Sequence, residues 1–203
     1  MNATIYTIGH SNHSLEGFLD LLTVHNITAV ADVRSQPVSS YTPHFSRDLL
    51  APALEQQGIS YVFLGQQLGG RSTNQACYKN GRLQYSQLAL EPSFDSGIAR
   101  VKKGTEQFRI ALMCSEKDPL GCHRALLVGR RLHGDGIKVQ HILANSQLQP
   151  HATLEMRLLA YCKLPEGDMF RDRSDCIADA YQIQGNRVAH ADEHQLNEIT
   201  RIE

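Results

Sequence analysis

The sequence predicts an α/β fold: an open, doubly wound, mostly parallel five-stranded sheet with helices on both faces, in a Rossmann-like or flavodoxin-like three-layer architecture. Two observations predict it. Apolar segments of strand length alternate five times with segments of helical periodicity. The strand segments are apolar at consecutive positions, which is typical of parallel strands covered on both faces. The 203 residues are 41% hydrophobic, enough to form a core.

The elements follow in order along the chain. Gly58 and the run Gly134-Asp135-Gly136 end two of the helices. Ser11 or Ser14 could cap the helix over 14–25, whose leucines and phenylalanine repeat at helical spacing. A long polar loop is predicted over 65–86, and 175–189 is predicted as either a helix or a hairpin. The predicted strands are 4–10, 28–34, 60–64, 108–114 and 138–143, and the predicted helices are 14–25, 46–57, 94–103, 122–133 and 151–162.

Charge divides the chain into two parts. Residues 1–164 hold 16 basic and 12 acidic side chains, a net charge of +4, while 165–203 hold 4 and 9, a net charge of −5. We interpret 1–164 as a single α/β domain and 165–203 as an acidic C-terminal appendage, packed on or trailing from that domain and adding solubility. The total of −1 excludes a protein that coats DNA, but the basic body permits a small anionic ligand.

The sequence also indicates the cellular compartment of the protein. No apolar run approaches the roughly 20 residues of a membrane helix, and the first residues lack the pattern of a secretory signal. We therefore predict a cytoplasmic protein with no membrane partner. Five scattered cysteines, an odd number, indicate free thiols in a reducing compartment. Oligomeric state and cofactor are not indicated by the sequence.

Polar residues follow the predicted strands at their carboxyl ends, where α/β sheets bind ligands. The architecture therefore gathers residues that are far apart in the sequence along one edge. The candidate catalytic residues are His10, Asp32, Cys114, Glu116, Cys122 and His123. The candidate ligand-binding residues are Gly9, Ser11, Arg34, Gly69, Gly70, Arg71 and Arg124.

The two cysteines are candidate nucleophiles. Cys122 stands at a predicted helix start, where backbone N–H groups favour the thiolate. Cys114 stands at a strand end, the position of the nucleophile in phosphatases and rhodaneses, but the arginine that those families need about six residues later is replaced by Leu120. Both cysteines could equally be buried structural thiols.

The histidines and the charged residues near these thiols can each be interpreted as functional or as structural. His10 or His123 could serve as the acid–base group, or each could be a hydrogen-bonded structural residue. Asp32 and Arg34 point to the same face of a strand, so Asp32 could be a base with Arg34 as an anion clamp. Alternatively, the two form an ion pair that holds neighbouring loops.

Two further classes of function stay open. Zinc accepts two thiolates and two imidazoles, but the spacing between Cys114 and Cys122 lacks the compact knuckle of a zinc finger, and we assign no residue as a metal ligand. Nucleic-acid binding is the other alternative, because basic residues and the aromatic Tyr78 and Tyr85 interleave in 71–86.

Several short blocks together carry a resemblance to a known family. The blocks are Thr7-Ile-Gly-His-Ser11, Asp32-Val-Arg-Ser35 with Pro37 and Pro43-x-Phe45, Leu64-Gly65, Leu68-Gly-Gly70, Met113-Cys-x-Glu116 and Cys122-His-Arg124. In this order, over about residues 5–160, they resemble the domain of unknown function 488 family. The resemblance implies a small bacterial or archaeal α/β protein, and it implies no activity.

The leading hypothesis is an uncharacterised enzyme, a Cys/His-dependent transferase or hydrolase, that acts on a small phosphorylated or nucleotide-like ligand at the carboxyl edge of the sheet. It depends on the convergence of the candidate residues at that edge. The nucleic-acid-binding module and the zinc site remain its alternatives.

Overall fold

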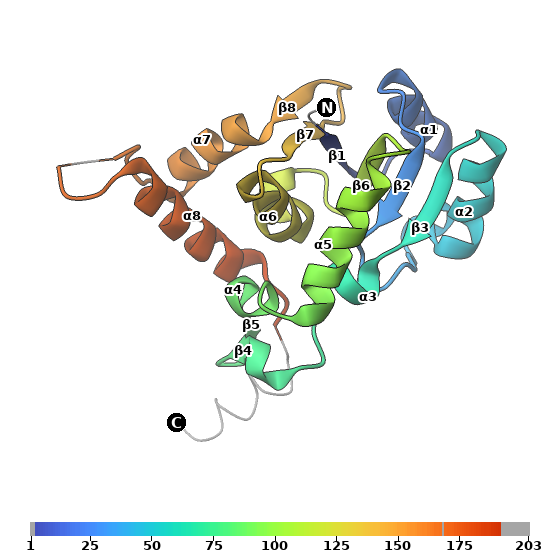
Figure 1. Ribbon diagram of the computed structural model, residues 1–203. Coiled ribbons are helices and arrows are strands. Elements are labelled where there is room, and N and C mark those ends of the chain that lie inside the picture. The colour runs from blue at the N-terminus through green and yellow to red at the C-terminus, as the bar shows by residue number, and fades with distance from the viewer. Residues whose placement is uncertain (1–2, 168, 192–203) are drawn as a thin grey trace.

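The computed structural model describes residues 3–167 and 169–191, and a six-stranded sheet forms its centre (Figure 1). The strand order is β3-β2-β6-β1-β7-β8, and the first five of these strands are parallel. These five are the strands that the sequence predicts. The strands are β1 (Thr4–Gly9), β2 (Ala29–Asp32), β3 (Ser60–Phe63), β6 (Ile110–Cys114), β7 (Lys138–Ile142) and β8 (Leu148–Pro150).

Helices connect the strands and follow the predicted alternation. The Ser14 hydroxyl accepts from the backbone N–H of Gly17 and begins α1, and the Asp172 carboxylate accepts from Asp175 N–H and begins α8. The helices are α1 (Leu15–Val24), α2 (Arg47–Gln56), α3 (Gly65–Leu68), α4 (Tyr85–Leu88), α5 (Pro92–Gly104), α6 (Arg130–Gly134), α7 (His151–Cys162) and α8 (Arg173–Val188).

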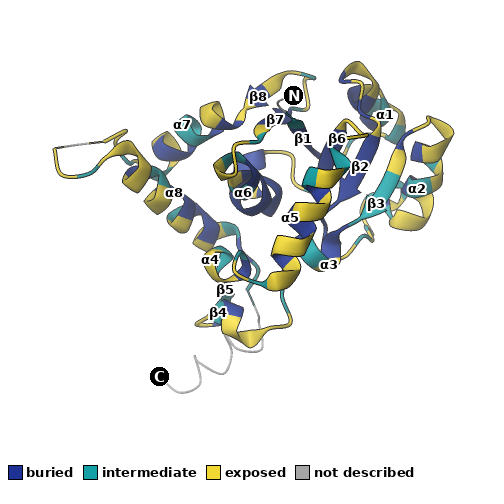
Figure 2. Cartoon of the chain, in the orientation of Figure 1, coloured by how far each residue is buried: buried dark blue, intermediate teal, exposed yellow. Residues whose placement is uncertain are grey.

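Two apolar layers sandwich the sheet, and Figure 2 shows its strands largely buried. On one face, α1 and α2 supply Phe18 and Leu54, which belong to one cluster with Val30 of β2. On the other face, Phe94 of α5 and Leu132 of α6 belong to a second cluster. Because successive side chains of a strand point to opposite faces of the sheet, each parallel strand contributes apolar residues to both clusters. The predicted three-layer α/β architecture is therefore confirmed.

The structure adds detail that the sequence pattern does not show. A sixth strand, β8, pairs antiparallel with β7; it has three residues and ends at Pro150, so it carries no periodic signal. The predicted loop 65–86 contains α3 and the hairpin of β4 (Tyr78–Lys79) and β5 (Arg82–Leu83). The stretch 175–189 is helical. The helix predicted from Cys122 begins as a π-helix, Arg124–Gly129, before α6.

The C-terminal segment packs on the rest of the chain as far as it is described. Cys176, Ala180 and Tyr181 of α8 are buried in a third cluster with Leu154 and Leu158 of α7. After α8, the backbone N–H of Leu83 donates to His190 O at 3.0 Å. The predicted appendage continues to residue 203, and 192–203 lie outside the described residues; a domain boundary at 164 stays a prediction. In the described ranges, no helix combines the length and apolar character needed to cross a membrane.

Candidate functional site

The parallel register brings three strand ends together. Gly9 at the end of β1 pairs with Cys114 at the end of β6, and Asp32 at the end of β2 pairs with Met113 of β6. The order of the sheet, with β6 between β1 and β2, is what makes these ends neighbours. The predicted convergence of His10, Asp32 and Cys114 at one edge is therefore a feature of the structure.

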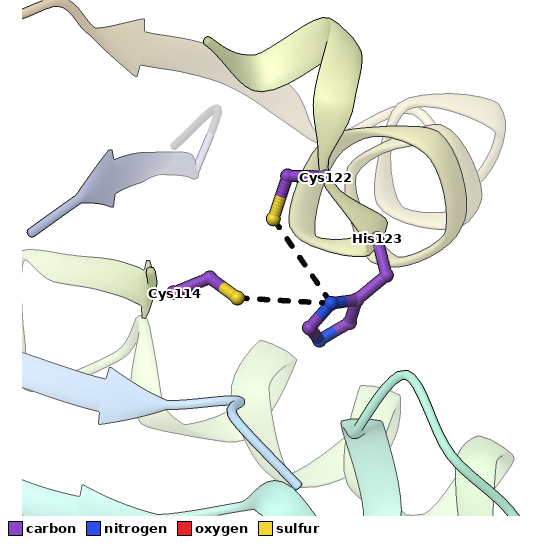
Figure 3. Close-up of side chains that lie close together, drawn as sticks. All are labelled: Cys114, Cys122 and His123. Carbon is purple, nitrogen blue, oxygen red and sulfur yellow. Dashed lines mark hydrogen bonds between the residues drawn. The ribbon is translucent and has the colours of Figure 1, made fainter. Parts of the chain in front are cut away.

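Four polar side chains meet beyond the end of β6, and we call them the thiol cluster: Cys114, Glu116, Cys122 and His123. A 3₁₀ turn, Pro119–Gly121, reverses the chain and returns Cys122 toward Cys114. Glu116 Oε2 lies 3.1 Å from Cys114 Sγ and 2.8 Å from Cys122 Sγ. Figure 3 shows both sulfur atoms pointing at the ring of His123, whose Nδ1 is 3.7 Å from Cys114 Sγ and 4.0 Å from Cys122 Sγ.

Hydrogen bonds orient this cluster. His123 Nε2 lies 2.9 Å from Val33 O, and because a carbonyl only accepts, Nε2 carries the proton and donates it. In the neutral ring, Nδ1 then presents its lone pair to the two sulfurs. The backbone N–H of Arg124 donates to Cys122 Sγ at 3.4 Å. The backbone carbonyl of Cys122 accepts the first backbone hydrogen bonds of the helix, from the N–H groups of Ala125 and Leu126. The prediction that Cys122 stands at a helix start is confirmed.

Burial and mutual charge shift the pKa of every member of the thiol cluster. Burial, with the neighbouring Cys122, raises the pKa of Cys114 well above its usual range. Burial also raises the pKa of Cys122, but its hydrogen bond with Cys114 and the charges of Arg124 and His123 outweigh burial and lower that pKa. Burial and Cys122 raise the pKa of Glu116, while Cys122 raises that of His123 against the effect of burial. The two buried thiols and the adjacent Glu116 carboxyl cannot all be ionised without a compensating positive charge.

A cavity of about 190 Å³ opens beside the cluster. It is smaller than the roughly 300–1,000 Å³ of sites for drug-sized ligands, so its size fits a small molecule. Cys114, Glu116 and His123 line it, whereas Cys122 is only 1% exposed and is not among the lining residues. The other lining residues include Arg34, Ser35, Gly70, Arg71, Tyr85, Ser115, Val188 and His190.

The three arginines predicted to bind an anion differ in their surroundings. The Arg34 guanidinium donates to both carboxylate oxygens of Asp32, at 2.9 and 2.6 Å. Arg124 is fully buried, donates to Glu116 O and Lys117 O, and thereby holds the loop that carries Glu116. Arg71 is exposed at the cavity and has no hydrogen-bond or ion-pair partner in the part of the chain that the structure describes. The geometry therefore favours Arg71 as the anion-binding residue.

His10 and Asp32 are each engaged in structural contacts. His10 Nδ1 donates to Ser11 O at 3.0 Å, its Nε2 faces the Arg34 guanidinium at 3.3 Å, and its ring stacks on Phe45. Burial, with the nearby charge of Arg34, lowers the pKa of His10 to about 4. The Asp32 carboxylate also accepts from the Tyr61 hydroxyl at 2.7 Å. These contacts favour the structural alternatives for both residues, and the geometry favours His123 over His10 as the acid–base group.

The predicted ligand-binding glycines and serine serve mainly to bring backbones close together. A Cβ on Gly9 would lie 1.9 Å from Glu116 O, and one on Gly69 would lie 2.3 Å from Gly65 O. Gly70 lines the cavity, where its missing Cβ leaves room for the His123 ring. Ser11 has a φ of 46° and donates its backbone N–H to Ser115 O.

Several residues of the site were not anticipated at this cavity. Tyr85, which the sequence suggests only for stacking on nucleic-acid bases, and Ser35 line the cavity, and the Ser35 hydroxyl has no hydrogen-bond partner within the described residues. Val188 and His190 also line it, although they lie in the segment interpreted as an appendage. Ser35 follows Arg34 directly, so its place at a strand end could have identified it. The sequence carries no comparable signal for Val188 or His190, since their position depends on the packing of α8.

Comparison with known proteins gives one match. The family model described as domain of unknown function DUF488 matches residues 14–130, a range that contains Asp32, Arg34, Arg71 and the whole thiol cluster. The block Thr7–Ser11 lies before the matched range, and Val188 and His190 lie after it. Searches of curated proteins and of solved structures found no match.

Proposed function

Since the chain belongs to the DUF488 family, whose description names no activity, we propose from its site that it is an enzyme, a hydrolase or transferase of small phosphorylated substrates. The observation that carries the proposal is that one small cavity is lined both by the Arg71 guanidinium, which has no partner within residues 3–167 and 169–191, and by the thiol cluster. Arg71 stands at the cavity beside Cys114, Glu116 and His123.

The two halves of the cavity supply complementary chemistry. Arg71 offers a planar set of donors that matches the oxygens of a phosphoryl group. The thiol cluster offers groups with shifted pKa values, which are typical of catalytic centres. Both cysteines are almost fully buried, but only Cys114 lines the cavity, so we place Cys114, rather than Cys122, on the substrate side of the cluster.

The volume of the cavity limits the substrate further. At about 190 Å³ it supports the recognition of a phosphoryl group and a small attached moiety. A nucleotide would have to leave much of its base and sugar outside. We therefore infer that the phosphorylated part of the substrate is what the site recognises.

Nucleic-acid binding through 71–86 has less support. Stacking on bases needs aromatic faces that are open to the ligand. Tyr78 is half-buried and its hydroxyl donates to Ser72 O at 2.9 Å, and Tyr85 is half-buried against the core. The β4–β5 hairpin, which carries Tyr78, is also bonded to the C-terminal segment through Arg82, which donates to Ala189 O.

Inorganic phosphate and p-nitrophenyl phosphate test the proposal. We expect the wild-type chain to bind phosphate in calorimetry and to hydrolyse the ester. The Arg71→Ala variant should bind phosphate about 10- to 150-fold more weakly, since a charge-assisted hydrogen bond contributes about 1.5–3 kcal/mol. Arg100→Ala removes an exposed arginine of α5 that does not line this cavity and is the matched control. Absence of phosphate binding by the wild-type chain, or equal weakening by both variants, contradicts the proposal.

A further inference from the structure

Three donor atoms of the thiol cluster lie close enough together to share one metal ion, and the Glu116 carboxylate lies beside two of them. Cys114 Sγ, Cys122 Sγ and His123 Nδ1 all lie within 4.8 Å of one another, and Glu116 Oε2 is 3.1 and 2.8 Å from the two sulfurs. Tetrahedral zinc with ordinary bond lengths separates its donor atoms by roughly 3.3–3.8 Å. The sulfur–nitrogen distances of 3.7 and 4.0 Å are close to this range, and the shorter oxygen–sulfur distances need only a small outward movement of the side chains.

We propose that Cys114, Cys122 and His123, with Glu116 as fourth ligand, bind a divalent zinc-type metal ion. Two thiolates and an imidazole are soft and borderline donors, which select zinc and exclude magnesium or calcium. The compact knuckle spacing of a zinc finger is not needed, because the end of β6 and the turn Pro119–Gly121 place the two sulfurs together in three dimensions.

The orientation of His123 is an independent observation. A histidine that binds a metal usually donates its other ring N–H to a carbonyl or carboxylate, which sets the tautomer and aims the free nitrogen. His123 does this through Nε2 and Val33 O, and the nitrogen left free is the one that faces both sulfurs. The backbone N–H of Arg124 and the guanidinium of Arg124 hold Cys122 and the Glu116 loop from outside.

Charge completes the argument. Two thiolates, a carboxylate and a neutral imidazole carry three negative charges, and the two thiolates are buried, which makes their charges very unfavourable without a counter-ion. A divalent ion neutralises two of them. The buried guanidinium of Arg124 lies next to the cluster and opposes the third.

The position of the ion relative to the cavity gives it a role. Glu116 lines the cavity, so its carboxylate is the ligand that a substrate oxygen could replace, leaving two cysteines and one histidine on the metal. That three-ligand set with an open fourth position is typical of catalytic zinc. The binding of the ion stands on the cluster alone, whereas its role as the Lewis acid that polarises a phosphoryl oxygen rests on the proposed function.

Metal analysis and cobalt spectroscopy test the inference on the full chain without an affinity tag. We expect about one zinc per chain after purification without chelator. Cobalt(II) added to chelator-treated protein should give thiolate-to-cobalt charge-transfer absorption and the strong visible bands of tetrahedral cobalt. Cys114→Ser and Cys122→Ser should each weaken the charge-transfer band by about half, because each removes one of two thiolates.

Cys77→Ser is the matched control. Cys77 is buried and, like the cluster cysteines, donates to a glutamate, at 3.5 Å from Glu91 Oε1, but it lies outside the cluster. Its variant should keep the zinc content and the cobalt spectrum of the wild-type chain. Circular dichroism identifies any variant that fails to fold. If a cluster variant does not fold, two measurements on the wild-type chain test the metal site instead: the cobalt spectrum, and the protection by zinc of the cysteine thiols from alkylation.

The outcomes separate this inference from the proposed function. No zinc, and no cobalt–thiolate absorption in the wild-type chain, overturns the metal site, as does a charge-transfer band that keeps its full wild-type intensity in both cluster variants. If a metal-free chain binds phosphate and this binding depends on Arg71, the proposed anion site is supported and does not require the metal ion. If the chain binds zinc but does not bind phosphate, the metal site is supported and the proposed function is contradicted.

Discussion

Asp32 and Arg34 have side chains of types that are common in catalytic sites, but here they form a buried ion pair with a structural role. Both are almost fully buried, and the Arg34 guanidinium is also bonded to Phe45 O at 2.9 Å. The pair therefore links the end of β2 to the segment before α2. A carboxylate with this many partners has little freedom to act as a base.

Removing one member of this pair should be costly. We expect Asp32→Asn to lower the free energy of unfolding by about 3–5 kcal/mol, because Arg34 keeps a buried charge without a counter-ion. Asp95→Asn breaks the exposed ion pair with Arg131 and should cost at most about 1 kcal/mol. Urea unfolding at pH 7 measures both. Similar losses in the two variants would show that the buried pair is not a structural link.

At the scale of elements, the close approach of β1 to the loop after β6 shapes the site. Gly9 ends β1 directly beneath the backbone of Glu116, and the N–H groups of His10 and Ser11 donate to Cys114 O and Ser115 O. The loop that carries Glu116 thus continues the pairing of β1 with β6 beyond the sheet. The absence of a side chain at Gly9 permits this contact.

A methyl group at this position should separate the two elements. Gly9→Ala places a Cβ 1.9 Å from Glu116 O and 3.1 Å from an Arg124 guanidinium nitrogen. We expect a loss of stability of about 1–3 kcal/mol or more from overpacking, together with weaker cobalt binding as Glu116 moves. Gly134→Ala, where the added Cβ meets nothing within 4 Å, is the control. A Gly9→Ala variant as stable as the control would contradict the packing described for β1.

At the scale of the whole molecule, a buried histidine chain joins the sheet to the C-terminal helices. His141 of β7 lies 3.0 Å from His151 of α7, which lies 2.8 Å from the Tyr181 hydroxyl of α8. Burial lowers the pKa of His141 well below its usual range. Burial, followed by the charges of His133 and Arg130, lowers that of His151 to about 3. Both rings are therefore neutral in the folded protein at pH 7.

This chain should make stability depend on pH. The unfolded chain binds protons to these histidines near pH 6.5 and the folded chain does not, so their contribution to stability is complete above pH 6.5 and is lost as pH falls toward 3. For His151 the loss by pH 5 is about 2 kcal/mol. Urea unfolding from pH 7.5 to 5 measures it, and His151→Gln should reduce the slope. An equal slope in that variant would contradict a neutral His151.

The sequence by itself determined the features that depend on neighbouring residues. Apolar periodicity marks the five parallel strands and their helices, and the residues at the strand ends follow from those boundaries. The block from Cys114 to Arg124 could be identified as a site because the strand, the turn and the helix start that arrange it lie within a few residues of one another.

Tertiary structure decided what depends on contacts between distant segments. The insertion of β6 between β1 and β2, the neutralisation of Arg34 by a buried carboxylate, and the bond from His123 to Val33 all join residues far apart in the chain. The place of Val188 and His190 at the cavity depends on how α8 packs against α7. Local sequence patterns show which side chains are apolar, but the tertiary packing determines which partner each buried polar group bonds to. That packing separates Arg71, which has no hydrogen-bond or ion-pair partner among the described residues, from Arg34 and Arg124, whose guanidinium groups are bonded to Asp32 and to the loop that carries Glu116.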